Sequence, residues 1–492
     1  MSDHSGYQSP FSQRYASWRM QSLFSDEHKF GLWRRLWIWL AQAEQAMGLP
    51  ITDEQIGQME EQAGDIDFDL AARYEKELRH DVMAHVHTFG DACPLARPII
   101  HLGATSCYVG DNADILILRD AMLLVQARLV AVARALYDFA DKHRDLPTLG
   151  FTHFQAAQPV TVGKRATLWL QDVLYDLGEV ERFLEDLRPL GSKGTTGTQA
   201  SFLELFDGDW DKVRQLDAML ARKMGFDKPV AVSGQTYSRK VDSRALSILA
   251  QIGQSAHKFS NDIRLLANLK EIEEPFEKQQ IGSSAMAYKR NPMRSERMAA
   301  LSRFLIANQQ NGAMTAAEQW LERTLDDSAN RRLAIAEGFL AADSVLMLYH
   351  NIASGLVVYP KMMERRLMAE LPFMATENIL MDAVRRGGDR QELHERIRVH
   401  SQAAAARVKL EGGDNDLLHR IAQDSAFDLD EQALRASLDP ARYIGCAAMQ
   451  TEEYLRGEAG EMLARYADIR LSSAEELEVF GVVTSCIHRL AP

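Results

Sequence analysis

The sequence lacks the features that mark several specialised classes of protein. Its 492 residues include only four cysteines, which are widely spaced and form no CxxC pair. This pattern argues against a disulfide framework or a cysteine zinc site and predicts a reduced, cytoplasmic protein. The polar N-terminus has no apolar segment of the signal-peptide type, and no run of about 18 apolar residues predicts a membrane span.

The chain also lacks a basic region. Its 56 Lys and Arg residues are outnumbered by 69 Asp and Glu residues, which gives a net charge of −13. Without a basic stripe or a low-complexity arm, binding to a nucleic acid polymer is not expected. The length exceeds what one compact core usually accommodates, so we expect two or three domains.

Strand signals are weak, and helical signals dominate. Apolar residues recur at helical spacing in four proline-free segments, at 113–143, 161–188, 240–270 and 293–358. Helices of this length and apolar content need to pack on one another and on partner chains. We therefore predict an all-α fold with a central bundle of long helices. The predicted domains are an N-terminal helical domain, the bundle and a C-terminal helical domain, at 1–106, 107–358 and 359–492.

The most informative stretch is residues 282–292, which run Gly-Ser-Ser-Ala-Met-Ala-Tyr-Lys-Arg-Asn-Pro. The small residues and the adjacent Ser283 and Ser284 predict a mobile loop with free backbone N–H groups. Lys289 and Asn291 add a cation and an amide donor. Such a loop is suited to closing over an anion and holding it.

This loop resembles the signature of the fumarase/aspartase superfamily, Gly-Ser-Ser-x-Met-Pro-x-Lys-x-Asn-Pro. It departs only at Ala287, where the superfamily usually has proline. Residues 277–281 and 293–297 narrow the resemblance to the adenylosuccinate lyases. The resemblance covers nearly the whole chain and weakens after about residue 415. It implies a three-part, all-helical homotetramer with shared active sites, small-molecule nucleotide substrates and no cofactor.

The reaction that this resemblance implies is β-elimination of fumarate from adenylosuccinate, which gives AMP. The same site would cleave succinyl-aminoimidazole carboxamide ribotide in purine biosynthesis. By the family match Ser283 is the general base, and Ser284 is the alternative that the sequence leaves open. Removal of the β-proton builds negative charge beside a carboxylate, and Lys289 with Asn291 would stabilise that charge.

Residues 150–155, Gly-Phe-Thr-His-Phe-Gln, predict a loop that leads into a long helix. Histidine titrates near neutrality and suits general acid or base work, although a lone loop histidine is most often a plain surface residue. Because this segment resembles an active-site segment of the family, the match implies that His153 is the general acid. It also implies that Thr152 contacts the substrate.

Three histidines, His80, His85 and His87, lie within eight residues. A metal site is one interpretation, but on a helix His85 points away from the other two, and no cysteine or carboxylate cluster completes four ligands. We therefore predict no metal. The resemblance implies that Arg79, His80 and Asp81 contact the substrate, with His80 near the phosphate or the catalytic histidine, and that the other two histidines are structural.

Further segments supply hydroxyl and cationic groups. Thr105 and Ser106 suit helix N-capping, as does Asp111 for the next helix, and the resemblance also makes the first two ligands of the succinyl carboxylates. The loop at 191–198 lacks the residue order of a P-loop, so we predict no nucleoside triphosphatase. Arginines often lie on solvated faces, but they also bind phosphate and carboxylate bidentately. The remaining ligands that the resemblance implies are Arg14, Tyr15, Gln235, Arg297, Arg323, Ser328 and Arg332.

Two other functions stay open from the sequence. The first is another fumarate-releasing lyase of the superfamily, such as one acting on argininosuccinate, which would lack the set of phosphate-binding arginines and histidines. The second is a non-enzymatic structural homologue, which would be expected to have lost a base, an acid or an anion ligand.

Overall fold

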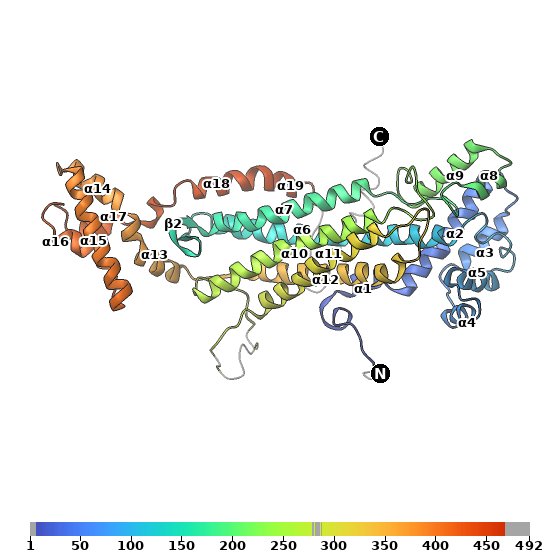
Figure 1. Cartoon of the computed structure of the whole chain (residues 1–492), viewed down its shortest axis with the longest axis horizontal. Coiled ribbons are helices and arrows are strands. Elements are labelled where there is room, and N and C mark those ends of the chain that lie inside the picture. The colour runs from blue at the N-terminus through green and yellow to red at the C-terminus, as the bar shows by residue number, and fades with distance from the viewer. Residues whose placement is uncertain (1–5, 278–279, 281–285, 287, 468–492) are drawn as a thin grey trace.

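The computed structural model describes residues 6–277, 280, 286 and 288–467, and it shows an elongated, mostly helical molecule (Figure 1). Long helices run side by side along the longest axis. Shorter N-terminal helices cover one end of them, and a helical cluster from the last third of the chain lies at the other end. The prediction of a predominantly helical fold is therefore confirmed.

Five long helices build the central bundle: α6 (Ser106–Lys142), α7 (Val162–Asp186), α10 (Lys240–Asn268), α11 (Met293–Ala317) and α12 (Asp327–Gly355). Their buried faces form one hydrophobic cluster that includes Leu129, Leu170 and Phe259. With 37 residues, α6 spans roughly 54 Å at 1.5 Å per residue. The length of the bundle therefore decides which of the predicted site residues can meet within one chain.

One helix, α12, is long and apolar enough to cross a membrane by length and composition. However, 61% of its most apolar window is buried inside the molecule. Phe339, Leu346 and Tyr349 on this helix belong to the bundle core. The apolar character of α12 is therefore explained by packing against the other bundle helices.

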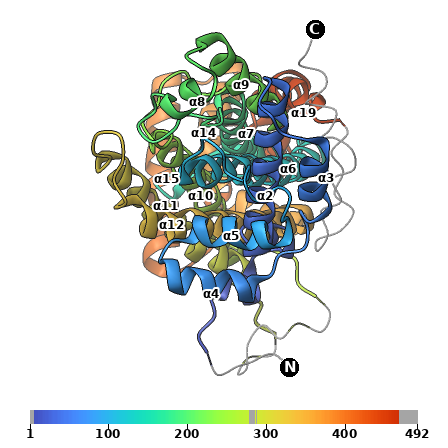
Figure 2. The ribbon, with the colours of Figure 1, turned by 90° about the vertical axis from the view of Figure 1, so that its right-hand side faces the viewer.

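The N-terminal end of the bundle carries a second hydrophobic cluster. Trp33, Trp37 and Phe89 pack there with Phe202 and Leu216, which come from a much later part of the chain. Figure 2 looks onto this end and shows the early helices beside the later pair α8 and α9. Two short helices, η1 (Phe11–Tyr15) and α1 (Trp18–Leu23), pack along the bundle before the chain reaches this end. The helices at this end are α2 (Asp26–Ala46), α3 (Asp53–Glu61), α4 (Phe68–Leu78), α5 (Asp81–Ala92), α8 (Ala200–Leu205) and α9 (Trp210–Lys223).

At the opposite end, a third hydrophobic cluster includes Leu371, Ile397 and Leu417. After it the chain turns back, and Leu455 and Leu463 join the core of the central bundle. The three-part division of the chain stays a proposal, since residues from each predicted part contribute to the bundle core. The elements in this region are α13 (Pro360–Met374), α14 (Thr376–Arg385), α15 (Arg390–Glu411), α16 (Leu417–Gln423), α17 (Glu431–Ser437), η2 (Pro440–Arg442), α18 (Ala447–Tyr454), η3 (Leu455–Ala459) and α19 (Gly460–Ala464).

The all-α prediction missed two small antiparallel sheets in the described part of the chain. They pair β1 (Pro147–Thr152) with β2 (Gln155–Thr161), and β3 (Ile272–Glu273) with β4 (Val357–Val358). Pro147, Gly150 and Pro159 obscured the first pair, because these residues weaken strands in most contexts. A two-stranded ribbon has only edge strands, which tolerate proline. Gly150 lies at a register shift where a Cβ would come within 2.4 Å of the Gln158 carbonyl oxygen.

The proline-free segment 293–358 forms two helices, α11 and α12, and not one. The break at 318–326 contains no glycine or proline, and Leu321 there has a positive φ of 49°. The two helices pack against each other and against α10. Tertiary packing therefore overrides a local preference to continue the helix.

Glu44 on α2 is a buried acidic residue whose burial can be tested by measuring stability at several pH values. Its side chain is fully buried and its carboxyl oxygens have no hydrogen-bond partner among the described residues. Burial raises the pKa of this carboxyl from 4.5 to about 9. In the intervening pH range the folded chain binds a proton that the unfolded chain has lost.

We expect the free energy of unfolding to fall as pH rises from about 5 to about 9, with a slope from this group of up to about 1.4 kcal/mol per pH unit. Glu44→Gln is neutral in both states and should remove that slope in urea titrations at several pH values. The exposed substitution Glu54→Gln is the control. An identical pH dependence in wild type and Glu44→Gln would contradict the assignment.

Candidate active site

The turn between α4 and α5 presents His80 toward the start of α6. Arg79 ends α4 in the left-handed conformation, with a φ of 55°. His80 is the N-cap of α5, and its Nδ1 accepts a hydrogen bond from the Met83 N–H at 3.3 Å. The other ring nitrogen, Nε2, lies 3.3 Å from Ser106 Oγ. The backbone turn thus fixes the ring and directs one nitrogen to Ser106, a predicted ligand of the succinyl carboxylates.

The next residue links this turn to α12. The Arg332 guanidinium lies 3.5 Å from Asp81 Oδ2, and both side chains are partly exposed. Thr105 is the N-cap residue of α6, yet its hydroxyl makes no capping hydrogen bond within the described chain. Its hydroxyl is therefore not used for capping, the alternative role that the sequence suggested. The structure brings these predicted residues together from α5, α6 and α12.

Gln235 joins two loops beside the same helix end. Its backbone N–H donates to the Glu322 carbonyl oxygen at 2.9 Å, and its Nε2 donates to the Thr195 carbonyl oxygen at 3.0 Å. Cys107 Sγ lies 3.4 Å from Gln235 Oε1. Arg323, close to Glu322 in the same loop, donates to both carboxylate oxygens of Asp327 at 3.1 Å. Gln235 and Arg323 therefore belong to the same end of the bundle as His80.

The loop at 191–198 has its lysine turned inward. Lys193 is 5% exposed and forms an ion pair with Asp217 of α9. The backbone N–H of Ser192 donates to the same carboxylate at 2.8 Å. At Gly197, whose φ is 79°, a Cβ would come within 1.9 Å of the Ser233 carbonyl oxygen. The loop therefore packs closely against the Gln235 segment, and its lysine is committed to a structural pair.

Sequence analysis missed His101, which lies near this group. Its Nδ1 accepts a hydrogen bond from the Trp37 indole N–H at 2.9 Å, and its φ is 70°. Burial, with a further contribution from the charge of His80, lowers the pKa of His101 to about 4. The ring is therefore neutral at pH 7. A left-handed backbone conformation leaves no mark in the sequence when the residue is not glycine.

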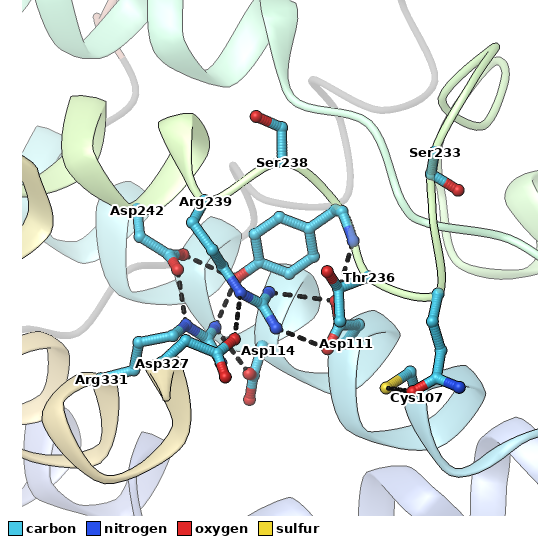
Figure 3. A network of polar contacts seen from close by, with 12 residues as sticks. Cys107, Asp111, Asp114, Ser233, Thr236, Ser238, Arg239, Asp242, Asp327 and Arg331 are labelled. Atoms are coloured by element: carbon cyan, nitrogen blue, oxygen red, sulfur yellow. Dashed lines mark hydrogen bonds and ion pairs between the residues drawn. The ribbon is translucent and has the colours of Figure 1, made fainter. Parts of the chain in front are cut away.

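Sequence analysis also missed a buried network of aspartates and arginines behind this group (Figure 3). Asp111, which the sequence suggested as an N-cap, lies inside α6 and pairs with Arg239 at 3.0 Å. Arg239 in turn pairs with Asp327 at 2.7 Å. In the sequence, these residues are visible only as charged residues at helical spacing. Such residues lie more often on the solvated face of a helix, so the network was not predicted.

The predicted general acid lies at the other end of α6. His153 and Phe154 form the turn between β1 and β2, and both have positive φ values, 52° and 56°. This two-residue connection is of the type that hairpins favour. His153 and Thr152 are exposed at the tip of the hairpin, and not on a simple loop as the sequence predicted. The 37-residue helix α6 thus separates them from the His80 group within the chain.

The described part of the signature loop, residues 286 and 288–292, lies at a third location, just before α11. Ser283, Ser284 and Ala287 lie outside the described residues. Lys289 is exposed, and its backbone N–H donates to the Met286 carbonyl oxygen at 3.0 Å. Asn291 precedes the start of α11 and is half-buried.

The remaining predicted ligands lie partway along the bundle. The Arg297 guanidinium on α11 lies 5.6 Å from the centre of the Tyr15 ring. Arg14 is the neighbouring residue in η1 and is exposed. Ser9 Oγ donates to Glu337 on α12 at 3.2 Å, which ties this segment to the bundle. One chain therefore presents the described members of its predicted site in three places: the His80 group, the hairpin tip, and the region of η1 and the start of α11.

Known proteins match this chain along nearly its whole length. A family model described as lyase matches residues 81–305, and one described as adenylosuccinate lyase C-terminus matches residues 372–454. The chain is 53% identical to an adenylosuccinate lyase of Saccharomyces cerevisiae, over 94% of this chain and 97% of that protein. It is 50% identical to an adenylosuccinate lyase of Schizosaccharomyces pombe, over 97% of this chain and 100% of that protein.

Solved structures show the same fold at lower identity. A fumarate lyase from a Mesorhizobium species aligns with a TM-score of 0.76 at 23% identity, covering 92% of this chain and 100% of that one. A 3-carboxy-cis,cis-muconate lactonizing enzyme from Pseudomonas putida aligns with a TM-score of 0.78 at 24% identity, covering 93% and 99%.

Proposed function

The chain belongs to the adenylosuccinate lyase family of carbon–nitrogen lyases in purine biosynthesis, and we propose that its three groups of site residues release fumarate from adenylosuccinate, giving AMP. The same chemistry would act on succinyl-aminoimidazole carboxamide ribotide. The observation that carries the proposal is the 53% identity over nearly the full length of both chains. A fumarate-release assay with the purified protein and each substrate tests it.

The reaction breaks the bond between the succinyl group and the purine amino nitrogen. In our proposal Ser283 takes the proton from the β-carbon, the electron pair forms the fumarate double bond, and His153 protonates the leaving nitrogen. Negative charge develops on the carboxylate beside the β-carbon before the bond breaks. Lys289 and Asn291 would stabilise that charge, because donors placed in advance act most strongly in a site that excludes water.

The start of α12 suits the nucleotide phosphate. The predicted ligands Arg323, Ser328 and Arg332 surround the first turns of this helix, and Asp326 at its N-cap makes no capping hydrogen bond within the described chain. A helix N-terminus favours an anion, and guanidinium groups bind phosphate bidentately. His80 lies beside this group through the contact between Asp81 and Arg332. We propose that this end of the bundle holds the phosphate.

We further propose a cytoplasmic homotetramer with shared active sites, working without a metal or cofactor. Exposed apolar side chains along the bundle helices support a partner surface, because contiguous exposed apolar area commonly marks an interface. The separation of His153 from the His80 group by the length of α6 supports sites that draw on more than one chain. The exposed apolar residues on these helices include Leu168, Tyr175, Leu265, Phe304, Ile306, Met314 and Leu333.

We predict that Ser283→Ala abolishes turnover and leaves the fold and substrate binding largely intact, because it removes only the base. Ser284→Ala is the matched control in the same loop. Fumarate release and circular dichroism are measured for both variants. Wild-type kcat in Ser283→Ala, together with loss of activity in Ser284→Ala, would move the base by one residue.

We predict that His153→Gln lowers kcat by at least about 100-fold, the usual scale for a lost general acid. The wild-type pH–rate profile should be bell-shaped, since a base and an acid must both be in the correct protonation state. His87→Gln is the control, because His87 on α5 packs against Tyr74 of α4, at the opposite end of α6 from His153. Near-normal activity of His153→Gln at pH 7 would exclude His153 from the mechanism.

We predict that inactive Ser283→Ala and inactive His153→Gln chains regain activity when mixed under conditions of subunit exchange. Some of the mixed sites would then receive a serine from one chain and a histidine from another. Light scattering measures the oligomeric state, and mass spectrometry of differentially labelled chains measures the exchange. A monomer in solution, or no recovery after proven exchange, would count against shared sites.

A further inference from the structure

The first turns of α12 carry two neighbouring rows of side chains with different surroundings. Asp327 and Arg331 lie four residues apart and belong to the buried network. Ser328 and Arg332, each one residue later, are predicted ligands, and Arg332 is 66% exposed. Residues four apart share a helix face, and consecutive residues differ by about 100°. Fixing the first row therefore fixes the direction of the second.

Asp327 lies between a buried arginine and a half-exposed one. It is 1% exposed. Arg239 Nε donates to its Oδ2 at 2.7 Å, and Arg323 Nη1 donates to both of its oxygens at 3.1 Å. The Arg323 side chain is 25% exposed, whereas that of Arg239 is 1% exposed. The carboxylate therefore connects the interior of the bundle to a predicted phosphate ligand.

The interior side of this connection is held from several directions (Figure 3). Arg239 donates to Asp111 of α6 through two nitrogens, at 3.0 and 3.2 Å. The Tyr237 backbone N–H donates to the same carboxylate at 2.9 Å. Burial lowers the pKa of Arg239, but the surrounding groups, Asp111 first among them, together outweigh burial and hold the pKa above its ordinary value. The guanidinium is thus permanently charged and fixed in place.

A second arginine fixes the same helix turn. Arg331 donates to Asp242 at 2.6 Å, to Asp114 at 2.8 Å and to the Tyr237 hydroxyl at 2.6 Å. The network therefore joins α6, the Gln235 segment, the start of α10 and the start of α12. Rotation of the first turns of α12 would break contacts to all of these elements.

Arg323 itself lies in a loop whose apolar side chains are largely exposed. Trp320, Leu321 and Leu325 in this loop are 68%, 96% and 72% exposed. A long arginine side chain on such a loop loses considerable conformational entropy when it is ordered. The contact with the rigid carboxylate of Asp327 supplies that order before any ligand binds.

We propose that Asp327 is a positioning residue that orients the Arg323 guanidinium for the phosphate of the nucleotide, with Arg239 anchoring the carboxylate from within the bundle. Asp327 itself does not touch the substrate. This inference rests on the proposed function for its ligand. Binding of AMP tests it without turnover, whereas fumarate release by the wild type tests the proposed function separately.

The experiment is a double-mutant cycle on AMP affinity, measured by calorimetry. Asp327→Asn and Arg323→Ala should each weaken AMP binding about tenfold. The double variant should bind no more weakly than Arg323→Ala alone, because Asp327 acts through Arg323. With adenylosuccinate, Asp327→Asn should raise KM about tenfold and change kcat less than about threefold, since the phosphate is remote from the reacting atoms.

Asp327→Glu keeps the charge opposite Arg239 and carries the test if the asparagine variant fails to fold. It displaces the carboxylate by one methylene and should weaken AMP binding in the same direction. Asp176→Asn, at a buried aspartate of α7 outside the network, is the control for the effect of an asparagine substitution in the bundle core and should leave AMP affinity unchanged.

Two results would overturn the proposal. The first is AMP affinity within about twofold of wild type in a folded Asp327 variant. The second is a loss from Asp327→Asn that persists undiminished in the Arg323→Ala background, which would assign Asp327 a general structural role.

Discussion

The buried contact of Arg239 with Asp111 and Asp327 is the interaction on which the end of the bundle with the predicted phosphate ligands depends. Apolar packing aligns the long helices but leaves their rotation and register adjustable. Charged groups withdrawn from water are costly unless they are paired, so the network tolerates only arrangements in which each arginine meets its carboxylates. Such a network contributes little net stability compared with apolar side chains. Its value lies in selecting one orientation of α6, α10 and α12.

The elongated bundle imposes the second constraint. Its helices hold side chains rigidly, but they hold the His80 group and the His153 hairpin at opposite ends of α6. A rigid rod cannot fold back on itself to bring these groups together. Completion of the site by neighbouring chains, as we propose, is a direct solution, and it would use the apolar side chains that one chain leaves exposed. Catalysis and assembly are linked in this proposal because both use the surface of the bundle.

Much of the fold was predictable because long apolar periodicity has few alternatives to a buried helix. The segments at 113–143, 161–188 and 240–270 correspond closely to α6, α7 and α10. The β1–β2 hairpin was not predictable, since its prolines and Gly150 disfavour strands in general and only the edge position of each strand accommodates them. The break between α11 and α12 likewise depends on packing against α10. Lys193, which resembles a phosphate ligand in sequence, is committed to Asp217 in the structure.

The family, the chemical types of the site residues and the predominance of helices could all be predicted from the sequence, because they follow from motif order and local periodicity. The folded chain alone reveals that His80 meets Ser106, that Arg332 meets the neighbouring Asp81, and that Asp111 pairs with Arg239 and does not cap a helix. It also places His153 at the opposite end of α6 from this group. The physical reason is that these relations join residues far apart in the chain. Their distances are set by how whole helices pack, and no local pattern encodes them.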